Sequence, residues 1–107
     1  MPNFVISYLG GDHPKTPEEG QQHMADYQQW LGALGDAVIS PANPFKDTHV
    51  VTPDGAVSKG SQTHMSGYTM VKADTIEEAI KMAQDCPFLK INGTLEVSEQ
   101  VQMSMGK

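Results

Sequence analysis

The stretch Ser66–Leu89, SGYTMVKADTIEEAIKMAQDCPFL, decides the fold, because it predicts a strand, a tight turn and a helix without interruption. Within it, Gly67–Ala73 alternates in character and contains Tyr, Thr and Val, which favour a half-buried strand. Asp74 stands at the expected N-cap of the helix. Pro87 ends the helix, since proline cannot continue the backbone hydrogen-bond ladder. A strand that feeds a helix packing back on it is half of a sheet-and-helix layer.

The helix after Asp74 is amphipathic. Glu77 follows Asp74 by three residues, the spacing of a capping box. Apolar residues at helical spacing form one stripe, which we expect to face the sheet: Ile76, Ala79, Ile80 and Ala83.

A second strand and helix precede this unit in the chain. Asn3–Leu9 is apolar on both faces, which predicts a central strand. Thr16-Pro17-Glu18-Glu19 predicts a helix start, and the helix should run to about Leu34 with Gly35 as its stop. The expected buried stripe of this helix comprises Met24, Tyr27, Leu31 and Leu34, with Trp30 at its border and at least partly buried.

Shorter strands complete the pattern. Asp36–Ser40 predicts a strand that lies at a sheet edge or ends early, because Pro41 and Pro44 follow it. Residues 48–58 predict a small hairpin around Pro53-Asp54-Gly55. Thr94–Met103 predicts the last strand.

The predicted order is β-α-β-hairpin-β-α-β. This order fits an α+β, ferredoxin-like antiparallel sheet with two helices on one face, formed by residues 1–107 as a single domain. The other sheet face would stay bare in one chain. We therefore expect a homodimer that covers it.

Composition limits the function. The chain of 107 residues has a net charge of −6 and no basic patch, which argues against a nucleic-acid partner. Its single Cys excludes an intramolecular disulfide and fits a reducing compartment. No stretch is long and apolar enough to span a membrane, and the N-terminus lacks the basic region of a signal peptide. We expect a cytoplasmic protein without a membrane contact.

The same C-terminal half carries a resemblance to a known family. GYTMVKADTIEEAIKMAQDCPFL followed by GTLEV resembles the C-terminal half of the YCII-related (YciI-like, DGPF-domain) family. The Asp-Gly-Pro-Phe signature that names the family is replaced here, since Ala56-Val57 follows Asp54-Gly55. The resemblance implies a ferredoxin-like fold and dimerisation into a dimeric α/β barrel.

His23 is the first candidate for catalysis. It lies on the first predicted helix, directly before apolar Met24, and a His can act as an acid or base near neutral pH. The YciI-type branch carries a functional His in its first helix, so the resemblance implies an acid/base His paired with an Asp. Asp26 and Asp36 are the available partners. A half-buried His at a helix border is the structural alternative.

Glu99 is the second candidate for catalysis. It shares a strand face with apolar Leu95, Val97, Val101 and Met103, where a carboxylate is costly unless it is paired or hydrated. We expect it to be buried in the cleft between the sheet and a partner subunit, with a raised pKa and His49 or His64 nearby. The alternatives are a β-bulge that turns it away, or a strand end that runs past the sheet.

Binding residues follow from the remaining His and aromatic side chains. We expect Tyr8 and Tyr68, with His49 and His64, to line a pocket for a small molecule, although aromatic residues at such positions also serve as core. The His spacing matches no zinc site, and no cofactor motif is present, so we expect neither a metal nor a cofactor. Gly10-Gly11 predicts a plain turn, with close approach of a ligand as the alternative.

Two functions remain open. The resemblance implies a cofactor-independent enzyme that does acid/base chemistry on a small ring compound, as related dimeric α/β-barrel proteins do. The alternative is a non-catalytic dimer that binds a small molecule or another protein.

Overall fold

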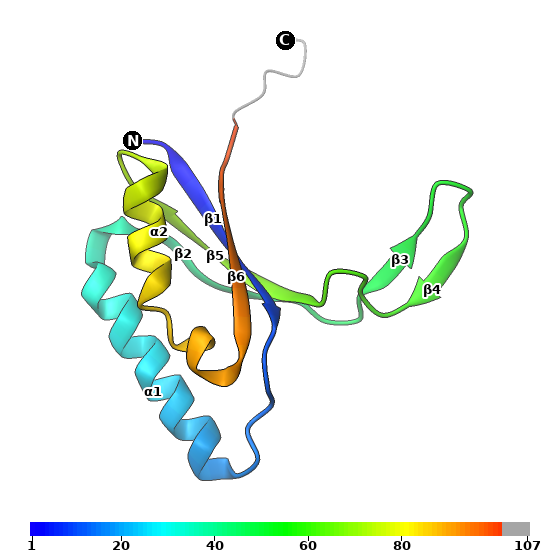
Figure 1. Ribbon diagram of the computed structural model, residues 1–107, viewed down its shortest axis with the longest axis horizontal. Helices are drawn as coiled ribbons and strands as arrows, with labels where there is room; N and C mark the ends of the chain where they lie inside the picture. The colour runs from blue at the N-terminus through cyan, green and yellow to red at the C-terminus, as the bar shows by residue number, and fades with distance from the viewer. Residues whose placement is uncertain (102–107) are drawn as a thin grey trace.

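A computed structural model of the chain describes residues 1–101. One four-stranded antiparallel sheet has the order β2-β5-β1-β6, with bounds β1 Asn3–Gly10, β2 Val38–Pro44, β5 Met65–Lys72 and β6 Gly93–Glu99. Helices α1 (Pro17–Leu34) and α2 (Ile76–Gln84) pack on it, as Figure 1 shows. This confirms the predicted ferredoxin-like α+β fold.

Strand β1 is central, as its two apolar faces predicted. Phe4, Ile6 and Tyr8 point to the helices and are buried, while the residues between them are half-buried on the other face. The side chains that join them in the core come from α1, β5, α2 and the turn after it: Trp30, Val71, Ala73, Ala79, Ala83 and Cys86. The indole N–H of Trp30 donates to the carbonyl of Met82 at 2.9 Å, which ties α1 to α2.

Helix α1 begins and ends where the sequence predicted. The hydroxyl of Thr16 accepts from the N–H of Glu19, Pro17 is the first helical residue, and Gly35 is the C-cap. The predicted buried stripe is wrong for Met24, whose side chain is 57% exposed. The helix lies closest to the core at Trp30, which is buried.

Helix α2 begins one residue later than predicted. The cap is Thr75, whose hydroxyl accepts from the N–H of Glu78, so the expectation of an Asp74 cap is wrong. The N–H of Ala73 bonds to the carbonyl of Pro2, so the chain is still tied to the strand N-terminus at the residue before Asp74. Ile80, predicted to be buried, is 40% exposed beside the edge strand β6.

The edge strands differ in length from the predictions. Strand β2 runs on through Pro41 and Pro44, because an edge strand leaves one row of N–H groups without a partner and so tolerates proline. Strand β6 ends at Glu99 rather than Met103, which lies outside the described residues.

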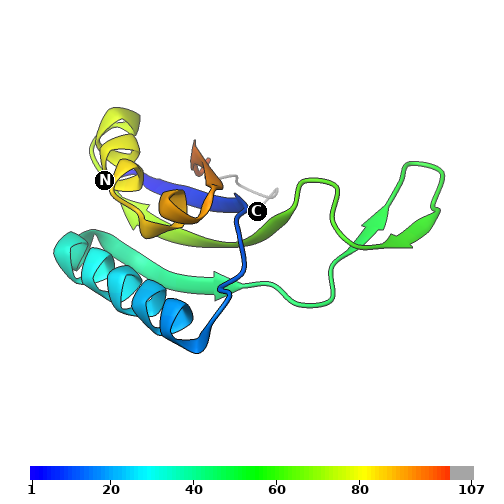
Figure 2. The ribbon, with the colours of Figure 1, turned by 60° about the horizontal axis from the view of Figure 1, so that its bottom comes forward.

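A separate two-stranded hairpin joins β2 to β5. It consists of β3 (His49–Val51) and β4 (Val57–Lys59), in agreement with the predicted hairpin. Figures 1 and 2 show that it projects away from the helices and the main sheet. Val51 and Val57 pair across it and are 68% and 65% exposed. In residues 1–101, no helix is long and apolar enough to cross a membrane.

The corrected cap gives a stability test. Thr75→Ala removes the hydroxyl that accepts a hydrogen bond from the N–H of Glu78. It should therefore lower the free energy of unfolding by about 1 kcal/mol. Asp74→Ala is the matched control and should change it by less than about half of that. Urea unfolding of both variants measures the difference, and a larger loss in Asp74→Ala would contradict the assignment.

Candidate functional site

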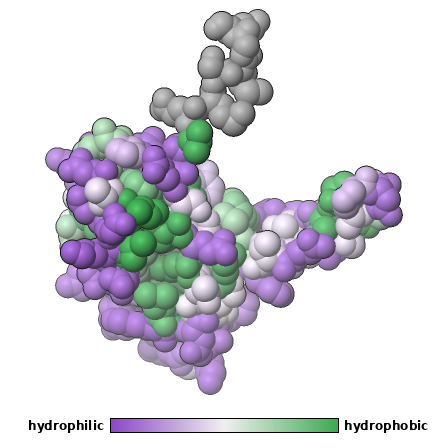
Figure 3. Space-filling model, turned by 45° about the horizontal axis from the view of Figure 1, so that its top comes forward, coloured by the Kyte–Doolittle hydropathy of each residue, from purple (hydrophilic) through white to green (hydrophobic). Residues whose placement is uncertain are grey.

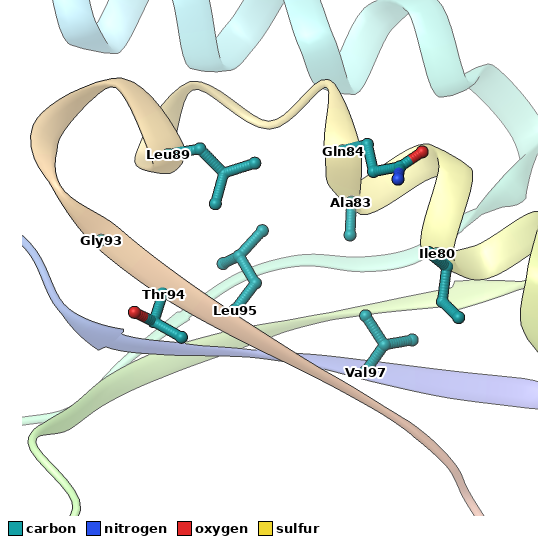
Figure 4. A pocket seen from close by; sticks show the side chains of 8 residues that line it. All are labelled: Ile80, Ala83, Gln84, Leu89, Gly93, Thr94, Leu95 and Val97. Carbon is teal, nitrogen blue, oxygen red and sulfur yellow. The ribbon is translucent and has the colours of Figure 1, made fainter.

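The cavity beside α2 offers little chemistry. It has a volume of about 470 Å³ and lies between α2 and the edge strand β6, where Figure 4 shows Ile80, Leu95 and Val97 directed toward it. Apolar side chains gather around it on the molecular surface (Figure 3). Its only polar lining side chains are Gln84 and Thr94, so it holds no group that could act as an acid or base near neutral pH.

A second cavity brings three predicted site residues together. It has a volume of about 280 Å³ and lies between α1, the β2 edge and β5. Five aromatic or imidazole residues line it, and we call it the tyrosine pocket: Tyr8, His23, Tyr27, Tyr68 and Phe88. A cavity of roughly half this volume holds a benzene ring, so a substituted single ring would fit.

The residues of the tyrosine pocket come from β1, α1, β5 and the turn after α2. Tyr8 is the last buried residue on the helix-facing side of β1. His23 and Tyr27 lie one helical turn apart on α1 and therefore on one face. Tyr68 of β5 pairs with Ser7 of β1, so its side chain belongs to the opposite face of the sheet from Tyr8. The centroid of its ring lies 5.8 Å from that of Phe45.

Three hydroxyl groups meet beside the pocket, two from its lining residues Tyr8 and Tyr27 and one from the buried Thr69. The Tyr8 hydroxyl contacts that of Tyr27 at 2.5 Å and is also hydrogen-bonded to the hydroxyl of Thr69. The hydroxyls of Tyr27 and Thr69 lie 2.8 Å apart. Both also approach the carbonyl oxygen of Pro41, at 3.0 and 2.7 Å. We call these three hydroxyls and this carbonyl the hydroxyl cluster.

The hydroxyl cluster has more close oxygen–oxygen contacts than hydroxyl protons that could bridge them. Each hydroxyl donates one hydrogen, whereas five close oxygen pairs are present. Thr69, which is completely buried, satisfies the Pro41 carbonyl when it donates there. The Tyr27 proton is then free to turn toward Tyr8 or toward a bound molecule. The cluster therefore offers a ligand both hydroxyl lone pairs and one donor that can be redirected.

Burial decides what the Tyr8 phenol can do. It raises the pKa of Tyr8 well above its usual value of 10.0, because the phenolate would lose hydration. Burial also raises the pKa of the neighbouring Cys86 thiol to about 11. Both groups stay neutral at physiological pH. Tyr8 is thus a hydrogen-bonding group rather than a base.

His23 is the imidazole of the tyrosine pocket. Its side chain is half-buried, and its ring centroid lies 6.5 Å from that of Tyr27. It also lines an adjacent cavity of about 260 Å³, which it shares with Asp12, His13 and Glu19. His23 therefore separates an apolar pocket from a cavity with charged walls.

Neither predicted partner of His23 meets it within the chain. Asp26 accepts a hydrogen bond from the amide of Gln22 at 2.8 Å. Asp36 lies beyond the end of α1, about 20 Å from His23 along the helix axis at 1.5 Å per residue. The carboxylates that share a cavity with His23 are instead those of Asp12 and Glu19, from the β1–α1 loop and the first turn of α1.

Within one chain Glu99 is exposed, and its expected burial against a partner subunit stays a prediction. Glu99 pairs with Phe4, so it does share a face with Leu95 and Val97, but this is the helix-covered face rather than the open one. It is exposed there, because it is the last residue of an edge strand. Neither alternative is observed, because the β1–β6 register is unbroken from Thr94 to Glu99 and Glu99 still pairs within the sheet.

His49 and His64 lie outside the tyrosine pocket and are exposed. His49 belongs to the projecting hairpin, where its Nδ1 is 2.9 Å from the carbonyl oxygen of Asp47. The carbonyl of His64 accepts from the N–H of Gly10, at the opposite end of β1 from the Phe4–Glu99 pair. Gly10 and Phe4 are about 20 Å apart along β1 at 3.3 Å per residue, so His64 does not reach Glu99 within the chain. His49 does not reach it either, because it belongs to the separate sheet of the hairpin.

Sequence reasoning missed Tyr27 and Phe88 as pocket residues, and Thr69 as their buried hydrogen-bonding neighbour. Tyr27 and Thr69 were expected only in a buried stripe and a strand. The usable signal was that Tyr27 follows His23 by four residues, which places both on one helix face. No group of three or more His, Cys, Asp or Glu side chains that could hold a metal occurs in the described chain.

The fold defines the class of protein as a ferredoxin-like α+β domain, and comparison with solved structures agrees. The chain is similar to 5-chloro-2-hydroxyhydroquinone dehydrochlorinase from Burkholderia phenoliruptrix AC1100, solved in complex with 2,5-dihydroxybenzoquinone. The identity is 16%, the TM-score is 0.58, and 94% of this chain and 95% of that chain are covered. No protein-family profile matches the chain, and no curated protein matches it either. The similarity therefore shows the fold alone.

The buried acids predict how stability depends on pH. Below pH 9 the Cys86 thiol is protonated in both states, whereas between about 9 and 11 only the unfolded chain loses the proton. Unfolding is therefore favoured as pH rises through this range. We expect the urea midpoint to fall from pH 9 to 11, and to fall less steeply in Cys86→Ala. Equal slopes in both proteins would contradict the raised pKa.

Proposed function

We propose that the chain is a YCII-related protein whose tyrosine pocket binds a small hydroxylated ring compound, and that His23 does acid/base chemistry on it without a cofactor. The observation that carries the proposal is the composition of this pocket, which combines aromatic walls, the hydroxyl cluster and one imidazole. Aromatic walls favour a flat ring, and hydroxyl groups in an apolar pocket favour its polar substituents. The name of the dehydrochlorinase with this fold, which describes a ring substrate, supports the same substrate class.

His23 has the chemical properties that this role needs. Among residues 1–101, none that lines the tyrosine pocket has a carboxylate, Lys or Arg side chain, and Tyr8 is held neutral. His23 is then the group in the pocket that exchanges a proton near pH 7. It could pass that proton to the adjacent charged cavity, where Asp12 and Glu19 lie.

The remaining predicted roles depend on a second copy of the chain. Tyr68 and Tyr8 act in binding within one chain, since both line the pocket. Glu99, His49 and His64 stay predictions, because only a partner subunit could bring them to a site. The cytoplasmic location also stays a prediction.

Proton exchange on a simple diol tests the enzymatic role. Resorcinol in D₂O slowly exchanges its ring C–H protons, because loss of a hydroxyl proton lets a ring carbon accept a deuteron before the C–H proton leaves. The protein should accelerate this exchange, and His23→Gln should reduce the acceleration by about 100-fold or more while it still binds resorcinol. Proton NMR measures the exchange rate, and calorimetry measures the affinity.

Two outcomes separate the alternatives. Binding without any acceleration would favour the non-catalytic small-molecule-binding dimer. Acceleration that survives in His23→Gln would remove His23 as the catalytic group. Gln22→Ala, one residue away on the exposed side of α1, is the matched control and should leave the exchange rate unchanged within about twofold.

We also propose a homodimer through the open sheet face. This face carries the half-buried side chains of Val5, Leu9, Met70 and Tyr68. Within residues 1–101, both α-helices pack on the other face of the sheet. Two copies would bury these faces against each other and form the dimeric α/β barrel that the sequence resemblance implied.

Sedimentation at micromolar concentration tests the dimer. The wild-type chain should sediment as a dimer also in high salt, since an apolar interface is screened little. Met70→Glu should produce a monomer, because it places a charge on the open face. Ile80→Glu, on α2, is the matched control and should leave the dimer intact. A wild-type monomer would contradict the proposal.

A further inference from the structure

One end of the tyrosine pocket is built around the ring of Phe88. This residue belongs to the 3₁₀ turn Pro87–Ile91, which follows α2. Its ring lies 5.1 Å from the ring of Tyr8, at an interplanar angle of 57°. Phe88 therefore touches the pocket residue that belongs to the hydroxyl cluster, and it lines the pocket itself.

Two glycines hold this ring from different sides. A Cβ atom at Gly93 would lie 2.2 and 2.3 Å from Cδ2 and Cε2 of Phe88, and a Cβ atom at Gly11 would lie 2.8 Å from its Cε1 and Cζ. The ring thus contacts Gly93 along one edge and Gly11 along the other. Contacts this close exclude any side chain at either position, so the ring occupies a slot that only glycine leaves open.

The two glycines differ in backbone conformation, since only Gly11 has a positive φ. Gly11 has φ +88, so its turn favours glycine in any case. Gly93 has no such conformation, and the nearest atoms to its added Cβ all belong to Phe88. The ring and the backbone carbonyl of Phe88 thus favour glycine at the start of β6. The plain turn predicted at Gly10-Gly11 also forms one wall of the slot.

We propose that Phe88 is the specificity-determining residue of the tyrosine pocket: its ring, fixed between Gly11 and Gly93, limits the pocket to single-ring compounds. This inference rests on the proposed function, and it adds the size of the ligand to its chemical class. A ring held on two edges cannot swing away to admit a larger molecule. A smaller residue at this position would extend the pocket toward the slot.

A pair of matched diols tests the inference. Resorcinol has one ring, and 1,3-dihydroxynaphthalene presents the same two hydroxyls on two fused rings. Calorimetry gives the ratio of their affinities for each protein. Phe88→Leu should shift this ratio toward the two-ring diol by about tenfold or more, since a few buried carbons are worth that much discrimination. Gly93→Ala should weaken resorcinol by a similar factor, because its methyl group displaces the ring.

Gly32→Ala is the matched control for the glycine substitution. Nothing lies within 4 Å of a Cβ at this exposed position of α1, so both affinities should stay within about twofold of wild type. Circular dichroism establishes that each variant is folded. If Gly93→Ala does not fold, the ratio in Phe88→Leu decides the question.

A measurement on the wild-type protein keeps the inference falsifiable without any variant. Nuclear Overhauser contacts should join the Phe88 ring to the Hα atoms of both Gly11 and Gly93, and to bound resorcinol. A ratio that changes less than about twofold in folded Phe88→Leu, or resorcinol bound without a Phe88 contact, would overturn the inference and leave the proposed function standing. Failure of the wild-type protein to bind either diol would overturn the proposed function itself, and the inference with it.

Discussion

The burial of one face of β1 is the constraint on which the rest of the structure depends. This strand pairs with β5 on one side and β6 on the other, so its helix-facing residues lie at the centre of the sheet. Phe4 and Ile6 are completely buried, and Tyr8, two residues further, is 8% exposed. Tyr8 belongs both to the core and to the tyrosine pocket. Its buried hydroxyl must be hydrogen-bonded inside the protein. Tyr27 from α1 and Thr69 from β5 satisfy it, and their own hydroxyls approach the Pro41 carbonyl of β2.

This arrangement makes stability and binding share the same groups. The hydroxyl cluster joins three elements to β1 and also lies beside the tyrosine pocket. A ligand hydroxyl that enters would replace contacts already present between the three hydroxyls rather than find empty donors. His23 stands apart from this cluster, and it alone links the pocket to charged residues.

The sequence predicted the fold well because the fold depends on local signals. The Thr16 cap, the alternation of β1 and the proline after α2 each act within a few residues. The exchange of Asp74 for Thr75 as a cap shows the limit of such signals, since the hydrogen bond from Ala73 to Pro2 joins residues far apart in the chain. The site was predicted only in part for the same reason. Phe88 reaches Tyr8 and Gly11 through the turn after α2, a contact that no spacing in the sequence reveals.

The hairpin β3–β4 has a consequence for how the molecule opens. Its strands pair only with each other, and backbone bonds from Phe45 to Ser66 and from Gly10 to His64 close the sheet where the hairpin departs. It can therefore unfold locally, exchange its amide hydrogens and be cut by a protease while the four-stranded sheet stays intact. Insertions or deletions within residues 46–63 would likewise leave the strand register and the tyrosine pocket undisturbed.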